Sequence, residues 1–194
     1  REQLYKILIK PDKNAPEYKA VVQAAKATQR APLDLLQQAG AIESPYQFHW
    51  QRFLFEFFPK GTAFPPLQAA PIDADALPLA DVQAFSMDDS NTTEIDDALS
   101  VSGLGTGTVT LGIHIAAPGL AVQPNDALDA VARTRLSTVY IPGYKITMLP
   151  ADVVQHYTLQ AGHTPPTVTL YVSFDEATLA LAGTRSHIER TPIA

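Results

Sequence analysis

The chain has 194 residues, of which 46% are hydrophobic and 18% are charged, a composition typical of a folded globular protein. It contains no cysteine, which excludes disulfides and thiolate metal sites, so any metal must be bound by oxygen or imidazole. The net charge of −6 argues against nucleic-acid binding driven by the charge of the whole surface.

The charge is unevenly distributed along the chain. Residues 1–60 contain nine Lys or Arg and six Asp or Glu, a net of +3, whereas residues 61–194 contain five and fourteen, a net of −9. No run of 18 apolar residues occurs, and the first residues lack the apolar core of a secretory signal. We therefore expect two domains with different roles in a cytoplasmic protein that does not enter a membrane.

The first sixty residues have the pattern of a small helical domain. Residues 16–30 and 32–39 are each expected to form a helix, because both begin with a proline that suits a first helical turn. The aromatic segment 41–58 fits a helix or a strand. Short basic helices followed by a ribbon would form a winged helix-turn-helix, so we predict a winged-helix-like domain over residues 1–60. Its lysines either contact RNA phosphates or lie on a solvated face.

A proline-rich segment, predicted to be a linker over residues 61–80, coincides with the change of charge. The pattern then changes to short strands. Two strands are expected around the turn "GLGTG", followed by a helix over 126–137, an extended segment with a turn at Pro142-Gly143, and a strand within 164–178. The final residues resemble the start of a further strand. The fold class is α+β, with residues 81–194 as an incomplete mixed domain.

One of these expected strands alternates between apolar and other residues. Val109, Leu111, Ile113 and Ile115 fall on one side, and Thr110, Gly112 and His114 fall on the other; these seven residues are consecutive. Strict alternation indicates a strand with one buried face.

Five carboxylates lie within ten residues between two expected strands, with no cation among them. In "MDDSNTTEIDDALS", residues 87–100, they are Asp88, Asp89, Glu94, Asp96 and Asp97. A solvated acidic loop is one interpretation. However, the last two acids run directly into an apolar strand, so at least one carboxylate is expected at the edge of the core. Like charges held that close are costly unless they are protonated or neutralised by a metal.

Ligation by carboxylates alone selects the hard cations Mg²⁺, Mn²⁺ and Ca²⁺. A calcium-binding EF-hand loop beginning at Asp88 is excluded, because its sixth position is Thr93 rather than Gly and its twelfth is Leu99 rather than Glu. A magnesium ion polarises a phosphoryl oxygen and generates hydroxide near neutral pH. The residues therefore predict a phosphodiester hydrolase that depends on Mg²⁺, with Mn²⁺ as the alternative metal.

Three segments also resemble a known family. "FSMDDSNTTEIDDALSV", "LGIHIA" and "TVYIPGYKITMLP" occur in the order found in the ribonuclease II / ribonuclease R (RNB) family of 3′-to-5′ exoribonucleases, and the resemblance covers about residues 81–175. It implies hydrolysis of single-stranded RNA with release of nucleoside 5′-monophosphates. The family's catalytic domain is longer and precedes an S1-type RNA-binding domain. We therefore expect a monomeric fragment that is inactive without the remaining C-terminal part of the same protein.

The resemblance assigns roles to individual acids. Asp88, Glu94, Asp96 and Asp97 fall on the four catalytic acids of the family, which hold magnesium at the scissile phosphate. It implies that Asp88 and Asp97 are direct ligands, and that Asp96 places the attacking water or the terminal nucleotide. Glu94 departs from the aspartate usual in the family, which leaves its geometry and metal preference open. Asp89 lies outside the set.

The resemblance places Tyr140 at the 3′ end of the RNA; the alternative is an aromatic residue packed in the core. His114 matches a position that we interpret as structural. Two other functions remain open. The helical, mildly basic front indicates a nucleic-acid-binding regulator of the winged-helix class, and Glu94 leaves open a catalytically inactive scaffold derived from the family.

Overall fold

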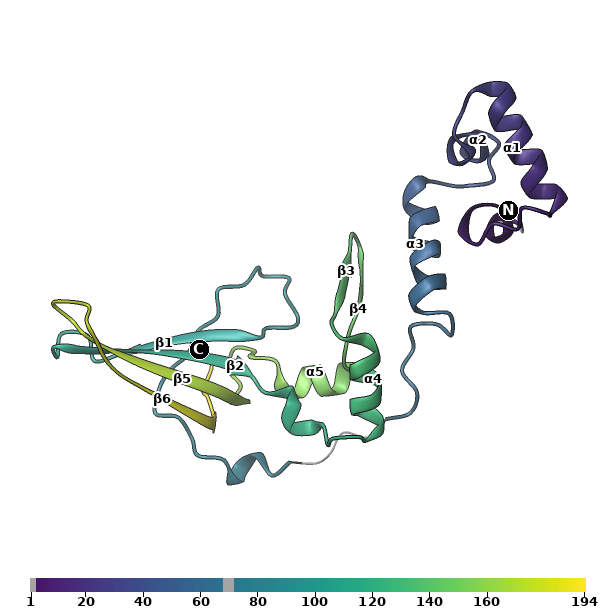
Figure 1. The fold of residues 1–194 in the computed structure, drawn as a ribbon. Coiled ribbons are helices and arrows are strands. Elements are labelled where there is room, and N and C mark those ends of the chain that lie inside the picture. Colours follow the sequence, from purple (N-terminus) through teal and green to yellow (C-terminus); the bar gives the residue numbers. More distant parts are fainter. Residues whose placement is uncertain (1–2, 68–71) are drawn as a thin grey trace. The chain divides into compact units, whose positions relative to one another are not determined.

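The structure is a computed structural model that describes residues 3–67 and 72–194 (Figure 1). The chain divides into two compact units, Arg1–Ala63 and Phe64–Ala194. The elements of the first unit are η1 (Tyr5–Ile9), α1 (Pro16–Thr28), α2 (Pro32–Gln38) and α3 (Pro45–Phe57). Those of the second are η2 (Ala74–Ala76), β1 (Asp97–Ser102), β2 (Thr108–Ala116), η3 (Pro118–Ala121), α4 (Ala127–Arg135), β3 (Val139–Ile141), β4 (Tyr144–Ile146), α5 (Ala151–Tyr157), β5 (Pro166–Asp175) and β6 (Leu181–Arg190).

The first unit is helical, and both helices predicted after prolines are present. The ambiguous aromatic segment forms a helix, α3, which begins at Pro45 and is capped by Ser44, whose Oγ accepts a hydrogen bond from the Gln47 N–H at 3.1 Å. The buried core of the first unit consists of one residue each from η1, α2, the turn before α3, and α3: Ile7, Leu36, Ile42 and Phe48. Residues 3–63 contain no strand, so the ribbon expected after the short helices is absent from this range.

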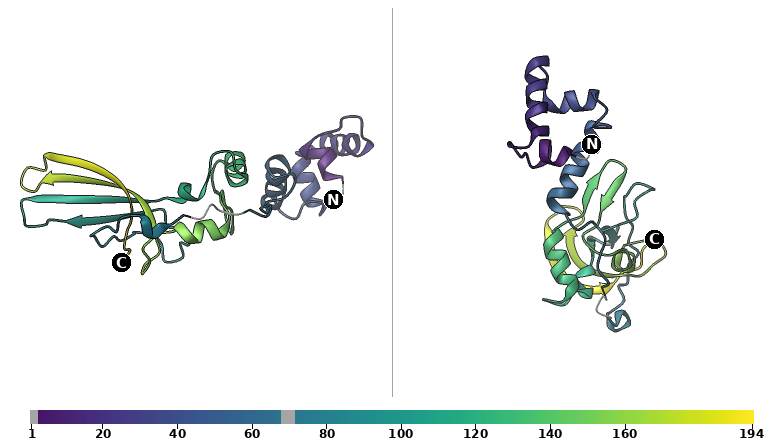
Figure 2. Two further views of the ribbon diagram at one scale, coloured as in Figure 1. Left: turned by 90° about the horizontal axis from the view of Figure 1, so that it is seen from below. Right: turned by 90° about the vertical axis from the view of Figure 1, so that its right-hand side faces the viewer.

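The second unit contains a four-stranded antiparallel sheet in the order β1-β2-β5-β6, and its strands are labelled in Figure 1 and seen from another side in the left view of Figure 2. The α+β class is confirmed. The predicted hairpin joins β1 and β2 through the turn at 103–107, and β6 is the strand expected near the end of the chain. Gly103 has φ +77°, and a Cβ atom there would lie 2.3 Å from the Thr108 carbonyl oxygen, so the turn requires glycine.

Backbone hydrogen bonds join the two edges of this sheet through two further segments. Beside β1, the N–H of Phe85 donates to the Leu99 carbonyl at 2.8 Å, and the N–H of Leu99 donates back at 2.9 Å. Ala84 in turn pairs with Ile193, which follows β6. These bridges join the two edges at one end of the sheet, which curls there into a partly closed ring with an inside and an outside face.

The inside face is the polar one. Gly112 and His114 of β2 are buried, whereas Ile115 of the apolar series is 44% exposed. The exposed apolar residues on the outer face are Val101, Ile115, Val168, Leu170 and Ile188. Alternation therefore identified a strand with one buried face, but the buried face carries the smaller and more polar side chains.

Two helices and a short hairpin accompany the sheet. Helix α4 is the predicted one, and β3 and β4 form the predicted extended segment with its turn. Helix α5 was not predicted, although Pro150 before it and the buried pair Val153 and Tyr157 at helical spacing are its signal. Among the described residues, no helix is both long and apolar enough to span a membrane.

Candidate active site

The acidic loop leads into β1, and its end is held by three backbone contacts. The N–H of Ile95 donates to Thr158 Oγ1 at 2.8 Å, and the Ile95 carbonyl accepts from the Leu159 N–H at 2.9 Å. The Asp96 carbonyl accepts from the Ala116 N–H at 2.8 Å. Residues 95 and 96 are therefore fixed between the end of α5 and the end of β2. Asp96 is thereby held at the edge of the core, where the sequence predicts at least one carboxylate.

Asp96 and Asp97 take different positions at this point. Asp97 is the first residue of β1, opposite Ile115, and alternation places it on the outer face because Ala98 and Ser100 are buried inside. Asp96 lines a pocket of about 160 Å³ instead. The other lining residues come from the loop, β2, η3 and α5 and from the segments next to them: Glu94, Ala116, Pro118, Thr138, Met148, Leu149, Val154, Tyr157 and Thr158.

The electrostatics of the loop converge on Asp96. Burial against the pocket raises the pKa of Asp96 above its ordinary value, and repulsion from Glu94, Asp97 and Asp88 raises it further. Lys145 opposes this rise. Glu94, Asp97 and Asp88 thus all act on Asp96 in the structure.

One cation lies against the acidic loop. Lys145 Nζ is 2.7 Å from Glu94 Oε1 and donates a hydrogen bond to Thr93 Oγ1 at 3.1 Å. The Glu94 side chain is 13% exposed and that of Lys145 is 37% exposed, so the pair is partly shielded from water. Sequence reasoning missed this contact, which joins residues 51 positions apart. A signal existed, since Lys145 is the single Lys or Arg between Arg135 and Arg185.

The same hairpin carries Tyr140. In the antiparallel pair β3–β4, Tyr140 lies directly opposite Lys145, so the two side chains project from the same face of the hairpin. Tyr140 is 71% exposed, whereas Ile146 on the other face is buried. The hairpin stands beside the loop before β1 in Figures 1 and 2, and the ion pair of Lys145 joins the two. Tyr140 is therefore an exposed aromatic residue next to the acids, not a core residue.

The donor set of the loop consists of carboxylate oxygens, which suit Mg²⁺ or Mn²⁺, and the repulsion on Asp96 is what a cation would relieve. The side chains are not gathered around one point, however. Among the described residues, no three acidic or histidine side chains lie close enough together to hold a metal ion. The chemistry of the donors fits a hard cation, while Glu94 already has Lys145 as its partner.

His114 is fully buried inside the ring. Its Nε2 is 2.8 Å from Ser100 Oγ, and its Nδ1 is 2.9 Å from Thr169 Oγ1 and 3.3 Å from Thr191 Oγ1. Burial lowers the pKa of His114, which keeps the ring neutral. These contacts agree with the structural role expected for this histidine.

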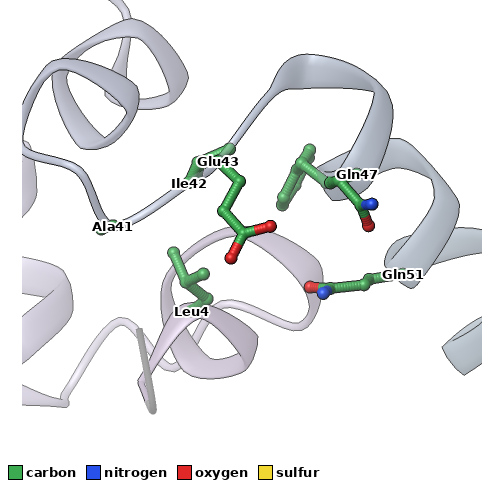
Figure 3. Close-up of a pocket in the computed structure, with 7 residues that line it drawn as sticks. Leu4, Ala41, Ile42, Glu43, Gln47 and Gln51 are labelled. Carbon is green, nitrogen blue, oxygen red and sulfur yellow. The ribbon is translucent and has the colours of Figure 1, made fainter.

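A separate pocket of about 300 Å³ lies within the first unit (Figure 3). Glu43, Gln47 and Gln51 point toward it, with Leu4 opposite. No feature of the sequence indicated this pocket. It contains neither a cation nor a nucleophile, so it adds nothing to the chemistry of the acidic loop.

The second unit is thus an α+β domain whose carboxylates before and at the start of β1 are of the kind that hold hard cations in metal-dependent hydrolases. Comparison with known families identifies it more closely: residues 77–193 match the RNB domain. The chain belongs to the RNB-domain family, and the resemblance stated from the three sequence segments is confirmed.

Curated relatives agree with this assignment. An uncharacterized ribonuclease of Synechocystis is 40% identical over 81 residues, which are 42% of this chain and 12% of the relative. Exoribonuclease 2 of Proteus mirabilis is 40% identical over 82 residues, which are 41% of this chain and 13% of the relative. The matched part is thus about an eighth of the length of these relatives.

Solved structures share the fold. Yeast Ssd1, a pseudonuclease, aligns with a TM-score of 0.57 and 24% identity over 68% of this chain and 17% of its own. Mycoplasma genitalium RNase R in complex with ribose methylated single-stranded RNA aligns with a TM-score of 0.55 and 23% identity over 60% of this chain and 18% of its own. At these identities the likeness concerns the fold alone.

Proposed function

We propose that this chain contributes the acid site of a magnesium-dependent exoribonuclease, which hydrolyses single-stranded RNA from the 3′ end and releases nucleoside 5′-monophosphates. The observation that carries the proposal is the spacing of Asp88, Glu94, Asp96 and Asp97 within a matched RNB domain, together with their mutual repulsion at Asp96. The relatives named exoribonuclease 2 support the reaction class.

The proposed roles follow from position and charge. Asp88, Asp96 and Asp97 would hold Mg²⁺, with Mn²⁺ as the alternative; when bound, the metal supplies charge stabilisation at the phosphoryl group and an activated water. Asp96, whose pKa is raised, orients the attacking water through a carboxylate oxygen. Tyr140, exposed beside the acids, stacks on the base at the 3′ end.

The direction of degradation can be tested with one pair of substrates. A linear single-stranded RNA labelled at its 5′ end and a circular RNA of the same sequence are incubated with the protein that contains this chain and Mg²⁺. We expect labelled products that shorten from the 3′ end, nucleoside 5′-monophosphates, and an intact circle. Cleavage of the circle, or release of the label as a mononucleotide at the earliest times, would contradict the proposal.

A second candidate is an inactive RNA-binding scaffold. The observation that favours it is the absence, among residues 3–67 and 72–194, of three acidic or histidine side chains converged for a metal. This candidate predicts binding of the linear RNA without any shortening in Mg²⁺ or Mn²⁺. A gel shift with a duplex DNA competitor would also identify the winged-helix regulator, which alone among these candidates prefers duplex DNA and binds it through residues 1–60.

A further inference from the structure

Glu94 occupies a position in the acidic loop that differs from the rest of the set. Its Oε1 atom forms an ion pair with Lys145 Nζ at 2.7 Å, and the side chain is largely removed from water. Asp88 and Asp97, in contrast, are exposed. The extra methylene that distinguishes Glu from Asp extends the carboxylate away from the backbone of the loop. That reach is consistent with a contact to another element.

The Lys145 contact has two anchors in the loop. The ammonium reaches Thr93 Oγ1 at 3.1 Å as well as Glu94, so the loop holds Lys145 through two adjacent side chains. The ammonium occupies Oε1 of Glu94, so a metal at this carboxylate would compete with Lys145 or be limited to Oε2.

We propose that Glu94 is a positioning residue which fixes the β3–β4 hairpin to the acidic loop through Lys145, and that it is not a ligand of the metal. The inference rests on the proposed function, in which the metal is held by Asp88, Asp96 and Asp97. Because Tyr140 lies opposite Lys145 on the same face of the hairpin, the ion pair sets the spacing between this aromatic ring and the acids. Glu94 and Lys145 therefore determine where the end of the RNA lies relative to the metal.

Metal affinity distinguishes a ligand from a positioning residue. Binding of Mn²⁺ to the 194-residue chain is measured by the loss of the electron paramagnetic resonance signal of free Mn²⁺, for the wild type, Glu94→Gln and Asp97→Asn. Asp89→Asn is the matched control, because it removes a charge from the same loop outside the set. We expect Asp97→Asn to weaken binding by about tenfold or more. Glu94→Gln should weaken it by no more than Asp89→Asn does. A loss in Glu94→Gln equal to that in Asp97→Asn overturns the inference.

Hydrogen exchange of the amides in 139–146 tests the positioning role without any metal. We expect faster exchange in Glu94→Gln and in Lys145→Met, which keeps the length of the lysine stem, and wild-type exchange in Lys145→Arg, which keeps the ion pair. Unchanged exchange in the first two variants overturns the inference. If the wild-type chain binds no Mn²⁺, the metal of the proposed function fails, and the exchange result still decides whether Glu94 positions the hairpin.

Discussion

Asp96 is the residue on which burial and repulsion act together. It lines the pocket at the end of α5, and the three other acids of the set raise its pKa in addition to the effect of burial. A raised pKa means that the folded protein retains a proton at pH values where the unfolded chain has lost it. The free energy of unfolding therefore falls as the pH rises from the ordinary value of 3.8 through the raised value.

Asp96→Asn should remove this pH-dependent loss of stability. In EDTA at pH 7, we expect the variant to have a larger free energy of unfolding than the wild type, by an amount on the order of 0.5 kcal/mol, since Asp96 is exposed although it lines the pocket, and water screens its charge. At pH 3 the two proteins should have the same stability. Urea unfolding at both pH values measures the difference, with Asp89→Asn as the control. A lower stability of Asp96→Asn at pH 7 would show that ionised Asp96 is stabilised by contacts other than those described.

Because the Tyr140 side chain is exposed, we expect it to contribute to RNA binding and not to folding. Tyr140→Ala should weaken the binding of a single-stranded RNA with a free 3′ end by about tenfold, the effect of losing one stacked base, and should leave the thermal unfolding midpoint unchanged. Tyr140→Phe keeps the aromatic face and should bind like the wild type. Fluorescence anisotropy in Ca²⁺ or EDTA separates binding from hydrolysis. Equal affinity of the Ala variant would remove Tyr140 from the RNA site.

The hairpin β1–β2 is where local sequence and structure agree best. Its glycine-rich turn and period of two were sufficient to predict both strands and the turn between them. Which face would be buried could not be predicted, because alternation distinguishes two faces without indicating which one other segments cover. Which face is covered depends on the pairing of Ala84 with Ile193 and of Phe85 with Leu99, and no local pattern in the sequence encodes these contacts.

The cluster of five acids could be found from the sequence, since they lie within ten residues, and the family resemblance selected four of them. The ion pair of Lys145 with Glu94 was not predicted, because a contact between residues 51 positions apart depends on the fold. Periodicity likewise did not decide whether the aromatic segment 41–58 forms a helix or a strand. Pro45 and the cap at Ser44 favour the helix that the structure contains.

The close packing inside the ring requires glycine at position 112. A Cβ atom there would lie 2.3 Å from Ser100 Oγ and 2.7 Å from His114 Nε2, the two atoms whose hydrogen bond crosses this residue. Gly112→Ala should therefore lower the free energy of unfolding of the second unit by about 1–3 kcal/mol. Gly183→Ala in β6, where nothing lies within 4 Å, is the matched control. Urea unfolding should show a shifted midpoint for the first variant only, and equal midpoints would contradict the described packing.

On the scale of the whole second unit, one buried network links its strands. His114 joins β1 through Ser100, β5 through Thr169, and the segment after β6 through Thr191, and Thr167 connects the two threonines at 3.0 Å and 2.7 Å. The polar inside face is satisfied by these internal hydrogen bonds. A neutral His114 is part of this network.

The stability of this unit should fall as the pH drops below about 6.5, the ordinary pKa of histidine. Burial lowers the pKa of His114 in the folded state, so the unfolded chain binds the proton first, and acid favours unfolding. Hydrogen exchange of the β5 amides between pH 7 and pH 5, corrected for the intrinsic rates, measures this loss of protection. His187→Gln, at an exposed position of β6, should preserve the pH dependence, and its disappearance in that variant would contradict the assignment to His114.

We have proposed that the carboxylates of the acidic loop carry out the hydrolysis of RNA. The most direct test is the rate at which the protein containing this chain degrades a 5′-labelled single-stranded RNA in Mg²⁺, for the wild type, Asp97→Asn and Asp89→Asn. We expect Asp97→Asn to lower the rate by about a hundredfold or more, and Asp89→Asn to retain it. Magnesium-dependent degradation by Asp97→Asn at the wild-type rate would show that these acids are not the catalytic site.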